Sequence, residues 1–260
     1  MDTLELGLAG KVAIVTGGSE GLGRACVERF ARSGAKVATC ARRKDVLERA
    51  AREIRRATGG DVLAMTCDVT RAEEVEAFVA ATVKRWSVVD ILVNNAGTSS
   101  AAGFEQVDDA QWQEDLDLKL MAAIRFCRLV IPHMKRRGGG RIINVTTVGG
   151  KAPAARSLPT SVTRAAGINL TKSLANEYAA DRILVNTICL GVVKSGQWER
   201  RIKGDPEAFY REMAEKRHVP LGRFGEAAEF ADLVAVLCSE RAAYITGTGI
   251  NFDGGMYAAV

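Results

Sequence analysis

Two hydrophobic periods alternate along the chain, and this alternation constrains the fold more than any other feature of the sequence. Short runs rich in β-branched residues predict strands at Lys11–Thr16, Lys36–Cys40, Val62–Thr66, Val89–Val93, Arg141–Thr146, Ile183–Ile188 and Thr248–Asn251. Amphipathic stretches between them predict helices at Leu22–Ser33, Asp45–Thr58, Ala72–Trp86, Asp109–Arg136, Thr160–Ala179 and Ala227–Ser239. Strands that alternate with helices make right-handed crossovers, which place the strands side by side and parallel.

The pattern continues from end to end without an internal repeat, so we expect one domain over residues 1–260. The expected architecture is an α/β Rossmann fold, a seven-stranded mostly parallel sheet with helices on both faces. The segment 191–225 is the long stretch without clear order, and it carries Trp198, Phe209 and Tyr210. We expect short helices there and interpret the segment as a substrate lid, with a plain surface insertion as the alternative.

Charge and composition narrow the possible partners. The net charge of +5 comes largely from residues 42–56, where the i,i+4 pairs Asp45–Arg49 and Glu48–Arg52 indicate a solvated helix face. No aromatic interleaving or binding motif accompanies this stretch, so nucleic acid is not expected as a partner.

Six cysteines lie far apart without a CxxC pair, and the chain has two histidines, so no metal site is expected. No apolar run reaches about 18 residues, and residues 1–10 carry no apolar signal core, so no membrane span is expected. Reduced thiols are typical of cytosolic proteins, and we therefore expect a cytoplasmic location.

A glycine-rich turn follows the first predicted strand and opens the first predicted helix. It runs Thr16-Gly17-Gly18-Ser19-Glu20-Gly21-Leu22-Gly23. Glycines let the backbone approach a pyrophosphate, and the helix N-terminus offers free N–H groups and a favourable dipole. Because the turn lies between a strand and a helix at the start of a βαβ unit, it predicts a dinucleotide site.

The end of the second predicted strand bears on which dinucleotide binds. An NAD site usually has an acidic residue here to hold the ribose 2′-hydroxyl, but this chain has Ala41 followed by Arg42. A guanidinium is suited to a 2′-phosphate, so NADP(H) is favoured over NAD(H). Against this, Glu20 places a negative charge in the glycine turn, and Arg42 and Arg43 would alternatively point into water.

With these features the sequence resembles the short-chain dehydrogenase/reductase family over nearly its whole length. The matching segments are Thr16–Gly23, Asp68 in Cys-Asp-Val, Asn94-Asn95-Ala96-Gly97, Pro220-Leu221-Gly222-Arg223, and the ending Ile245-Thr246-Gly247 with Asn251-Phe252-Asp253-Gly254-Gly255. We therefore expect cofactor contacts at Gly17, Ser19, Gly21, Leu22, Gly23, Arg42, Asp68, Val69, Asn94, Ala96, Gly97, Arg164, Gly191 and Val193.

The resemblance also implies a catalytic tetrad of Asn, Ser, Tyr and Lys, and this chain departs from it at every position. The corresponding residues are Lys119, Thr147, Thr160 and Arg164, respectively. Thr147 keeps a hydroxyl that can donate to an oxyanion, and Arg164 keeps a cation. Thr160 is the severe change, because an aliphatic hydroxyl is shorter than a phenol and does not ionise usefully near neutral pH.

Lys119 is the unexpected member of this set. Its side chain would either reach out to water along the edge of the buried helix stripe or enter the space that the family fills with Lys and Tyr. In the second case the charge of Arg164 would lower the lysine pKa, which would suit a general acid or an imine-forming nucleophile. Tyr210 and His218 in the predicted lid are alternative proton donors, although packing or surface roles are the simpler interpretation for both.

Three functions are compatible with this sequence. The first is an NADP(H)-dependent oxidoreductase that transfers hydride to or from a small carbonyl, alcohol, imine or alkene, with a non-standard proton donor. The second is an inactive NADP(H)-binding relative that acts as a sensor or assembly subunit, and the third is a non-redox enzyme that uses Lys119. The resemblance further implies a homotetramer or homodimer built through the helices at 109–136 and 160–179, where Ala165, Ala166 and Gly167 would allow close helix approach.

Overall fold

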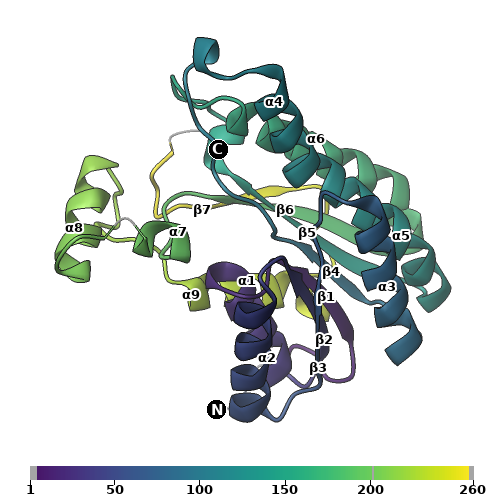
Figure 1. Ribbon diagram of the computed structural model, residues 1–260. Coiled ribbons are helices and arrows are strands. Elements are labelled where there is room, and N and C mark those ends of the chain that lie inside the picture. The colour runs from purple at the N-terminus through teal and green to yellow at the C-terminus, as the bar shows by residue number, and fades with distance from the viewer. Residues whose placement is uncertain (1–4, 201, 258–260) are drawn as a thin grey trace.

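The order of the strands fixes where a ligand can bind. The computed structural model describes residues 5–200 and 202–257, and within them seven parallel strands form one sheet in the order β3-β2-β1-β4-β5-β6-β7 (Figure 1). The strands are β1 (Val12–Thr16), β2 (Lys36–Ala41), β3 (Val62–Thr66), β4 (Ile91–Asn94), β5 (Gly140–Thr147), β6 (Ile183–Leu190) and β7 (Gly249–Phe252). Because the strand order reverses between β1 and β4, the carboxyl ends of these two strands flank the crevice where such sheets bind ligands.

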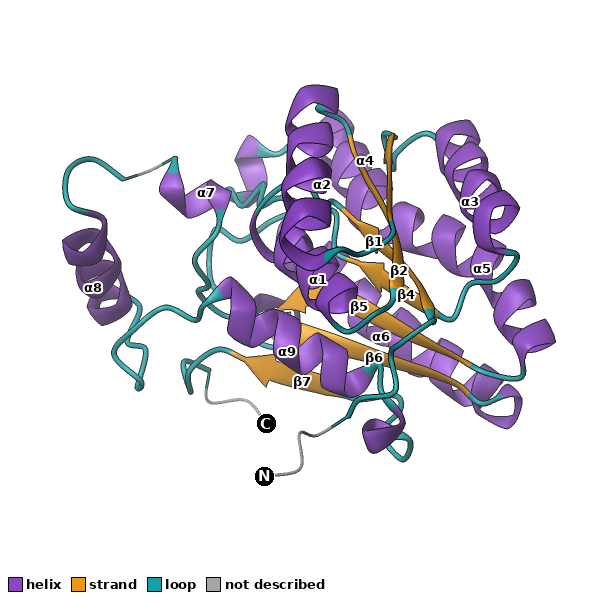
Figure 2. Cartoon of the chain, turned by 90° about the horizontal axis from the view of Figure 1, so that it is seen from below, coloured by secondary structure: helices purple, strands orange, loops and turns teal. Residues whose placement is uncertain are grey.

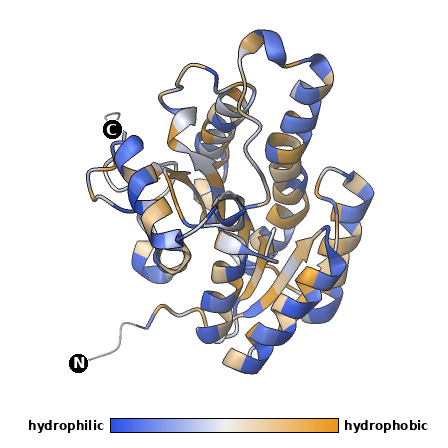
Figure 3. Ribbon diagram, turned by 60° about the vertical axis from the view of Figure 1, so that its left-hand side comes forward, coloured by the Kyte–Doolittle hydropathy of each residue, from blue (hydrophilic) through white to orange (hydrophobic). Residues whose placement is uncertain are grey.

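Helices cover both faces of the sheet, as Figures 1 and 2 show. One face carries α1 (Gly21–Arg32), α2 (Lys44–Thr58) and α9 (Ala227–Leu237), and the other carries α3 (Ala72–Trp86), α5 (Ala122–Arg137) and α6 (Thr160–Tyr178). The apolar colours of Figure 3 concentrate on the strands and on the helix sides that meet them. Short 3-10 turns lie at Phe104–Gln106, Val148–Gly150, Ala179–Asp181 and Glu240–Ala242.

Large aromatic side chains fill the two cores. Phe30 and Phe230 are buried under the first face, and Phe78 and Phe126 meet edge to face under the second, with ring centroids 6.1 Å apart. Burying one such side chain stabilises a fold by about 1.5–3 kcal/mol. The sequence prediction of a single α/β Rossmann fold is thus confirmed, and every sheet pairing in the described part of the chain is parallel.

Most predicted boundaries hold within one or two residues, and the start of β4 shows why they shift. The apolar run predicted a strand from Val89, but the strand begins at Ile91. The side chain of Asp90 accepts a hydrogen bond from the Val12 backbone N–H at 2.8 Å. Just before β4, the Val12 N–H therefore donates to a side-chain carboxylate instead of to a backbone carbonyl of the neighbouring strand. The hydrophobic pattern of the sequence does not show this substitution.

The helix predicted at Asp109–Arg136 is not continuous, and this is the main correction to the predicted elements. It consists of α4 (Asp109–Leu116), a π-helical turn at Asp117–Met121, and α5, which ends at Arg137. A π-helical turn holds an extra residue, so it changes which side chains face inward, and such turns frequently occur at functional sites. Here the turn contains Lys119.

The segment 191–225 projects from one edge of the sheet (Figure 1). It contains the short helices α7 (Gly196–Glu199) and α8 (Pro206–Lys216), as expected. Its own small apolar cluster contains Val192, Tyr210, Ala214, Val219 and Phe224. In the described part of the chain, no helix has the combination of length and apolarity that crossing a membrane requires.

Candidate active site

The glycine turn is tied to the end of β4 by hydrogen bonds. Thr16 Oγ1 accepts from the backbone N–H groups of Asn95 (3.0 Å) and Ala96 (2.9 Å). The Asn95 side-chain amide donates in return to the carbonyls of Thr16 (2.9 Å) and Gly17 (3.3 Å). The segment that follows β4 thus fixes the turn that follows β1, at the point where the strand order reverses.

Two glycines of the turn leave no room for a side chain. A Cβ at Gly23 would lie 2.2 Å from the Gly17 carbonyl oxygen, and a Cβ at Gly18 would lie 2.0 Å from Thr39 Oγ1. Helix α1 begins at Gly21 with no side-chain cap, so the N–H groups of its first turn remain available to an anion. The turn therefore fits a pyrophosphate.

The charges beside the turn are divided between two arginines. Glu20 pairs with Arg43 at 2.5 Å and approaches Arg200 at 3.8 Å, so its negative charge is compensated by these two guanidinium groups. Arg42 is exposed and lies near Asp68. Partial burial raises the pKa of Asp68, but hydrogen bonds from Thr70 and the nearby charge of Arg42 outweigh this and hold it below its usual range.

The remaining residues predicted to contact a cofactor surround the same edge of the sheet. Asn94 donates to Asn144 at 2.8 Å, which joins β4 to β5. Val69 is buried, and Val193 is buried beside Gly225. A Cβ at Gly191 would lie 2.6 Å from the Asp253 Cβ. Ser19 and Gly21 line a hollow at the start of α1, and Leu22 packs against the core.

Three of the four residues that the family resemblance assigns to the tetrad lie close together. Lys119 from the π-helical turn and Arg164 from α6 line a cavity of about 20 Å³, enough for about one water molecule. Thr160, the first residue of α6, contacts the Lys119 ammonium. Thr147 ends β5, and among the described residues no hydrogen bond joins its hydroxyl to the other three.

Lys119 points inward rather than out to water. Its side chain is 1% exposed, and its ammonium donates to Asp115 Oδ1 and to Thr160 Oγ1, the latter at 2.9 Å. The pKa of Lys119 is lowered to about 8, mainly by burial and also by the charge of Arg164, while the bond to Asp115 opposes both effects. A lysine with this pKa exchanges a proton readily near neutral pH.

The Thr160 hydroxyl is oriented by two donors. Its Oγ1 accepts from the Ser100 backbone N–H at 3.0 Å and from the Lys119 ammonium at 2.9 Å. A hydroxyl has two acceptor positions and one proton. Because both acceptor positions are used, the proton of Thr160 is left to be donated elsewhere.

Arg164 is held beneath the same cavity. Its Nη1 donates to the Val145 carbonyl at 2.7 Å, and a Cβ at Gly97 would lie 2.7 Å from its Nη2. Its Nε is buried without a hydrogen-bond partner among the described residues. Burial lowers the pKa of Arg164 to about 10, against the opposing charge of Asp115. The guanidinium therefore has bonding capacity left for a ligand.

The alternative proton donors in the segment 191–225 have other surroundings. Tyr210 is 7% exposed, and its ring centroid lies 5.1 Å from that of Phe224, so Tyr210 is a packing residue. Burial is the largest effect on the pKa of Tyr210 and raises it. His218 is exposed, with a backbone φ of 51°.

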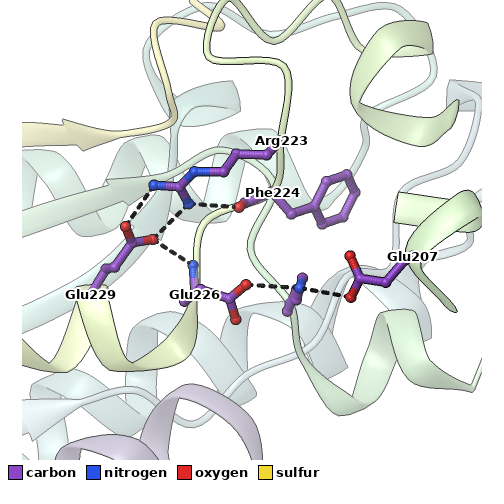
Figure 4. Close-up of polar contacts among 6 residues, drawn as sticks. Glu207, Arg223, Phe224, Glu226 and Glu229 are labelled. Atoms are coloured by element: carbon purple, nitrogen blue, oxygen red, sulfur yellow. Dashed lines mark hydrogen bonds and ion pairs between the residues drawn. The ribbon is translucent and has the colours of Figure 1, made fainter. Parts of the chain in front are cut away.

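Ion pairs hold this segment together and join it to α9. Lys194 pairs with Glu226 at 2.8 Å and with Glu207 of α8 at 3.4 Å, and Arg223 pairs with Glu229 of α9 at 2.6 Å (Figure 4). The side chain of Glu207 is largely exposed and that of Glu229 is partly exposed. Each of these ion pairs therefore contributes little to the stability of the fold by itself.

Asp115 is the site residue that the sequence interpretation missed. It is 2% exposed and bonds both Lys119 and Thr163. The i,i+4 spacing of Asp115 and Lys119 on a predicted helix was the available signal. That spacing usually indicates an exposed pair, so it did not reveal a buried one.

Comparisons with known proteins agree with this geometry. The family model described as "Enoyl-(Acyl carrier protein) reductase" matches residues 17–257. A putative ketoacyl reductase of Streptomyces coelicolor is 34% identical over 259 residues, which cover 95% of this chain and 97% of the relative. L-sorbose reductase from Gluconobacter frateurii, solved with NADPH and L-sorbose, is 36% identical with a TM-score of 0.93, over 99% of this chain and 100% of that one.

A further solved structure is the NADPH-bound short chain oxidoreductase from Pseudomonas aeruginosa PAO1, which contains an atypical catalytic center. It is 37% identical with a TM-score of 0.93, over 96% of this chain and 98% of that one.

A doubly wound parallel sheet with a glycine turn at its switch point defines a protein of the Rossmann class. Within that class, the matches over almost the whole length show that this chain belongs to the short-chain dehydrogenase/reductase family of oxidoreductases. The resemblance inferred from the sequence is thereby confirmed.

Proposed function

We propose that the protein is an NADP(H)-dependent oxidoreductase that transfers hydride to or from a small-molecule carbonyl, alcohol, imine or alkene. Two similar structures, L-sorbose reductase and the Pseudomonas aeruginosa oxidoreductase, were solved with NADPH. The observation that carries the proposal is the hydrogen bond from Lys119 to Thr160, beside a glycine turn that fits a pyrophosphate.

The chain has groups for each part of the cofactor. The first turn of α1 would hold the pyrophosphate, and Arg42 would hold the 2′-phosphate, because Glu20 is already engaged by Arg43. The unpartnered Nε of Arg164 fits a ribose hydroxyl. Bound there, the nicotinamide would supply or accept the hydride.

The chain's own residues supply the proton. Lys119 donates toward Thr160 Oγ1, and the hydroxyl proton of Thr160 is free to be donated to a substrate. We therefore propose a relay in which Thr160 passes a proton to the substrate and regains one from Lys119. Thr147, at the end of β5, would donate its hydroxyl to the developing oxyanion.

The charge balance of the cavity suits this chemistry. Protonated Lys119 and Arg164 contribute two positive charges, and Asp115 contributes one negative charge. The remaining positive charge stabilises negative charge that develops on a substrate oxygen, and it does so strongly where water is excluded.

The test begins with fluorescence titration of the purified protein with NADPH and with NADH. A screen of ketones, imines and activated alkenes for NADPH oxidation follows, with Lys119→Met and Thr160→Val as variants. Turnover that both variants reduce while they still bind NADPH supports the proposal. NADPH binding without turnover on any substrate favours a sensor or assembly subunit, and turnover without redox change in the cofactor favours a non-redox enzyme.

A further inference from the structure

We propose that Asp115 is a positioning residue of this site, whose carboxylate bridges Lys119 and Thr163 and fixes the Lys119 ammonium against the Thr160 hydroxyl. The inference rests on the proposed function, because it assigns Asp115 a role in the same proton relay. Asp115 lies at the end of α4, outside the four tetrad positions.

Both carboxylate oxygens of Asp115 accept hydrogen bonds from side chains that line the cavity. Oδ1 accepts from the Lys119 ammonium, and Oδ2 accepts from Thr163 Oγ1 at 2.7 Å. Thr163 is 1% exposed and also approaches the Thr160 carbonyl at 3.1 Å, so its hydroxyl is fixed by α6. A carboxylate held at both oxygens can hold the ammonium in one place.

The bridge connects three elements that meet at Thr160. Asp115 comes from α4, Lys119 from the π-helical turn, and Thr160 and Thr163 from the first turn of α6. Without the bridge, a long lysine side chain has several rotatable bonds and no fixed direction. The π-helical turn directs the Lys119 side chain inward, and the hydrogen bond to Asp115 fixes the position of the Lys119 ammonium.

The second effect of Asp115 is electrostatic. The charged groups that face Lys119 are Asp115 from α4 and Arg164 from α6, and Thr160 adds a neutral hydroxyl. Burial and Arg164 lower the lysine pKa, while Asp115 raises it. Removal of the carboxylate charge would leave two cations facing each other, and the Lys119 pKa would fall further.

A matched pair of variants separates this role from a merely structural one. Asp115→Asn keeps the size of the side chain and removes its charge. Asp117→Asn is the control, because Asp117 pairs with Arg125 at 3.3 Å and its side chain is 28% exposed. In protein with ¹³C-labelled lysine, NMR titration gives the Lys119 pKa without cofactor or substrate, and Lys119→Met identifies its signal.

We expect the Lys119 pKa to fall by about 1–3 pH units in Asp115→Asn. It should stay near that of the wild type in Asp117→Asn. An unchanged pKa in folded Asp115→Asn overturns the proposal.

Thr163→Val provides a second test that leaves the carboxylate in place. It removes one anchor of the bridge, so turnover should fall while the Lys119 pKa changes less than in Asp115→Asn. Full turnover in this variant overturns the positioning role.

The NMR result and the activity result distinguish the two proposals. If the wild type turns over a substrate, the pH at which kcat falls on the alkaline side should move with the Lys119 pKa across the variants. If no substrate is turned over, the proposed function fails. The pKa of Lys119 in Asp115→Asn still decides whether Asp115 controls the ammonium.

Discussion

Lys119 should make the stability of this protein depend on pH in the alkaline range. Burial is the main reason that its pKa is about 8 in the folded protein, against 10.5 for an ordinary lysine. Between these values the unfolded chain binds more protons than the folded one, so stability rises with pH. The lysine contribution is complete above 10.5 and is lost as the pH falls through 8.

The size of this effect follows from the two pKa values. The difference between 10.5 and about 8, at about 1.4 kcal/mol per pH unit, gives about 3 kcal/mol. The side chain is 1% exposed, so solvent screening does not reduce this figure greatly.

The pH dependence that Lys119 causes can be measured by urea unfolding. The unfolding free energies of the wild type and of Lys119→Met are compared from about pH 7 to about pH 10.5. Titrating groups that do not interact with Lys119 contribute equally to both proteins, so their effect cancels in the difference between the two unfolding free energies; Asp115 and Arg164, which interact with Lys119, are included with it. Between about pH 7 and about pH 10.5, the unfolding free energy of the wild type should rise by about 3 kcal/mol relative to that of Lys119→Met. Lys119→Gln should give the same slope, and a difference that stays flat with pH would refute the reasoning.

Four further results are expected. Gly23→Ala should abolish NADPH binding in a fluorescence titration, because its Cβ would lie 2.2 Å from the Gly17 carbonyl oxygen; unchanged affinity contradicts this. Arg42→Ala should weaken NADPH binding about tenfold or more and leave NADH affinity nearly unchanged, and equal losses would argue against a 2′-phosphate contact. Thr160→Val should bind NADPH normally and lose turnover about a hundredfold, whereas full activity would remove Thr160 from the relay. Light scattering should show a homotetramer, and a monomer at micromolar concentration is the opposite result.

The predicted tetramer interface needs one correction. Gly167 was expected to allow close approach of a partner helix, but it faces inward. A Cβ there would lie 3.3 Å from Thr146 Cγ2, and Gly167 lines the cavity beside Arg164. Its small size therefore serves packing of α6 on β5, while Ala165 and Ala166 remain candidates for the helix interface.

The amino-acid sequence was enough to predict the Rossmann fold and the glycine turn at the candidate site. Periods of two and of 3.6 residues depend only on neighbouring residues, and they predicted the strands and helices of the sheet layers except for the break that separates α4 from α5. The glycine turn could also be predicted, because it lies within one short segment between β1 and α1. The resemblance to the family assigned the four substituted positions, and the continuity of α6 from Thr160 to Arg164 preserves the spacing of two of them.

The contacts and surroundings of these side chains could not be predicted before the folded structure was known. A one-residue change of phase in the π-helical turn directs Lys119 inward, and no hydrophobic pattern distinguishes that turn from a regular helix. The pairing of Asp115 with Lys119, and of Glu20 with Arg43, depends on how separate elements meet and on burial. Local sequence sets which groups are present, whereas their charge states and partners follow from the low-dielectric surroundings that folding creates.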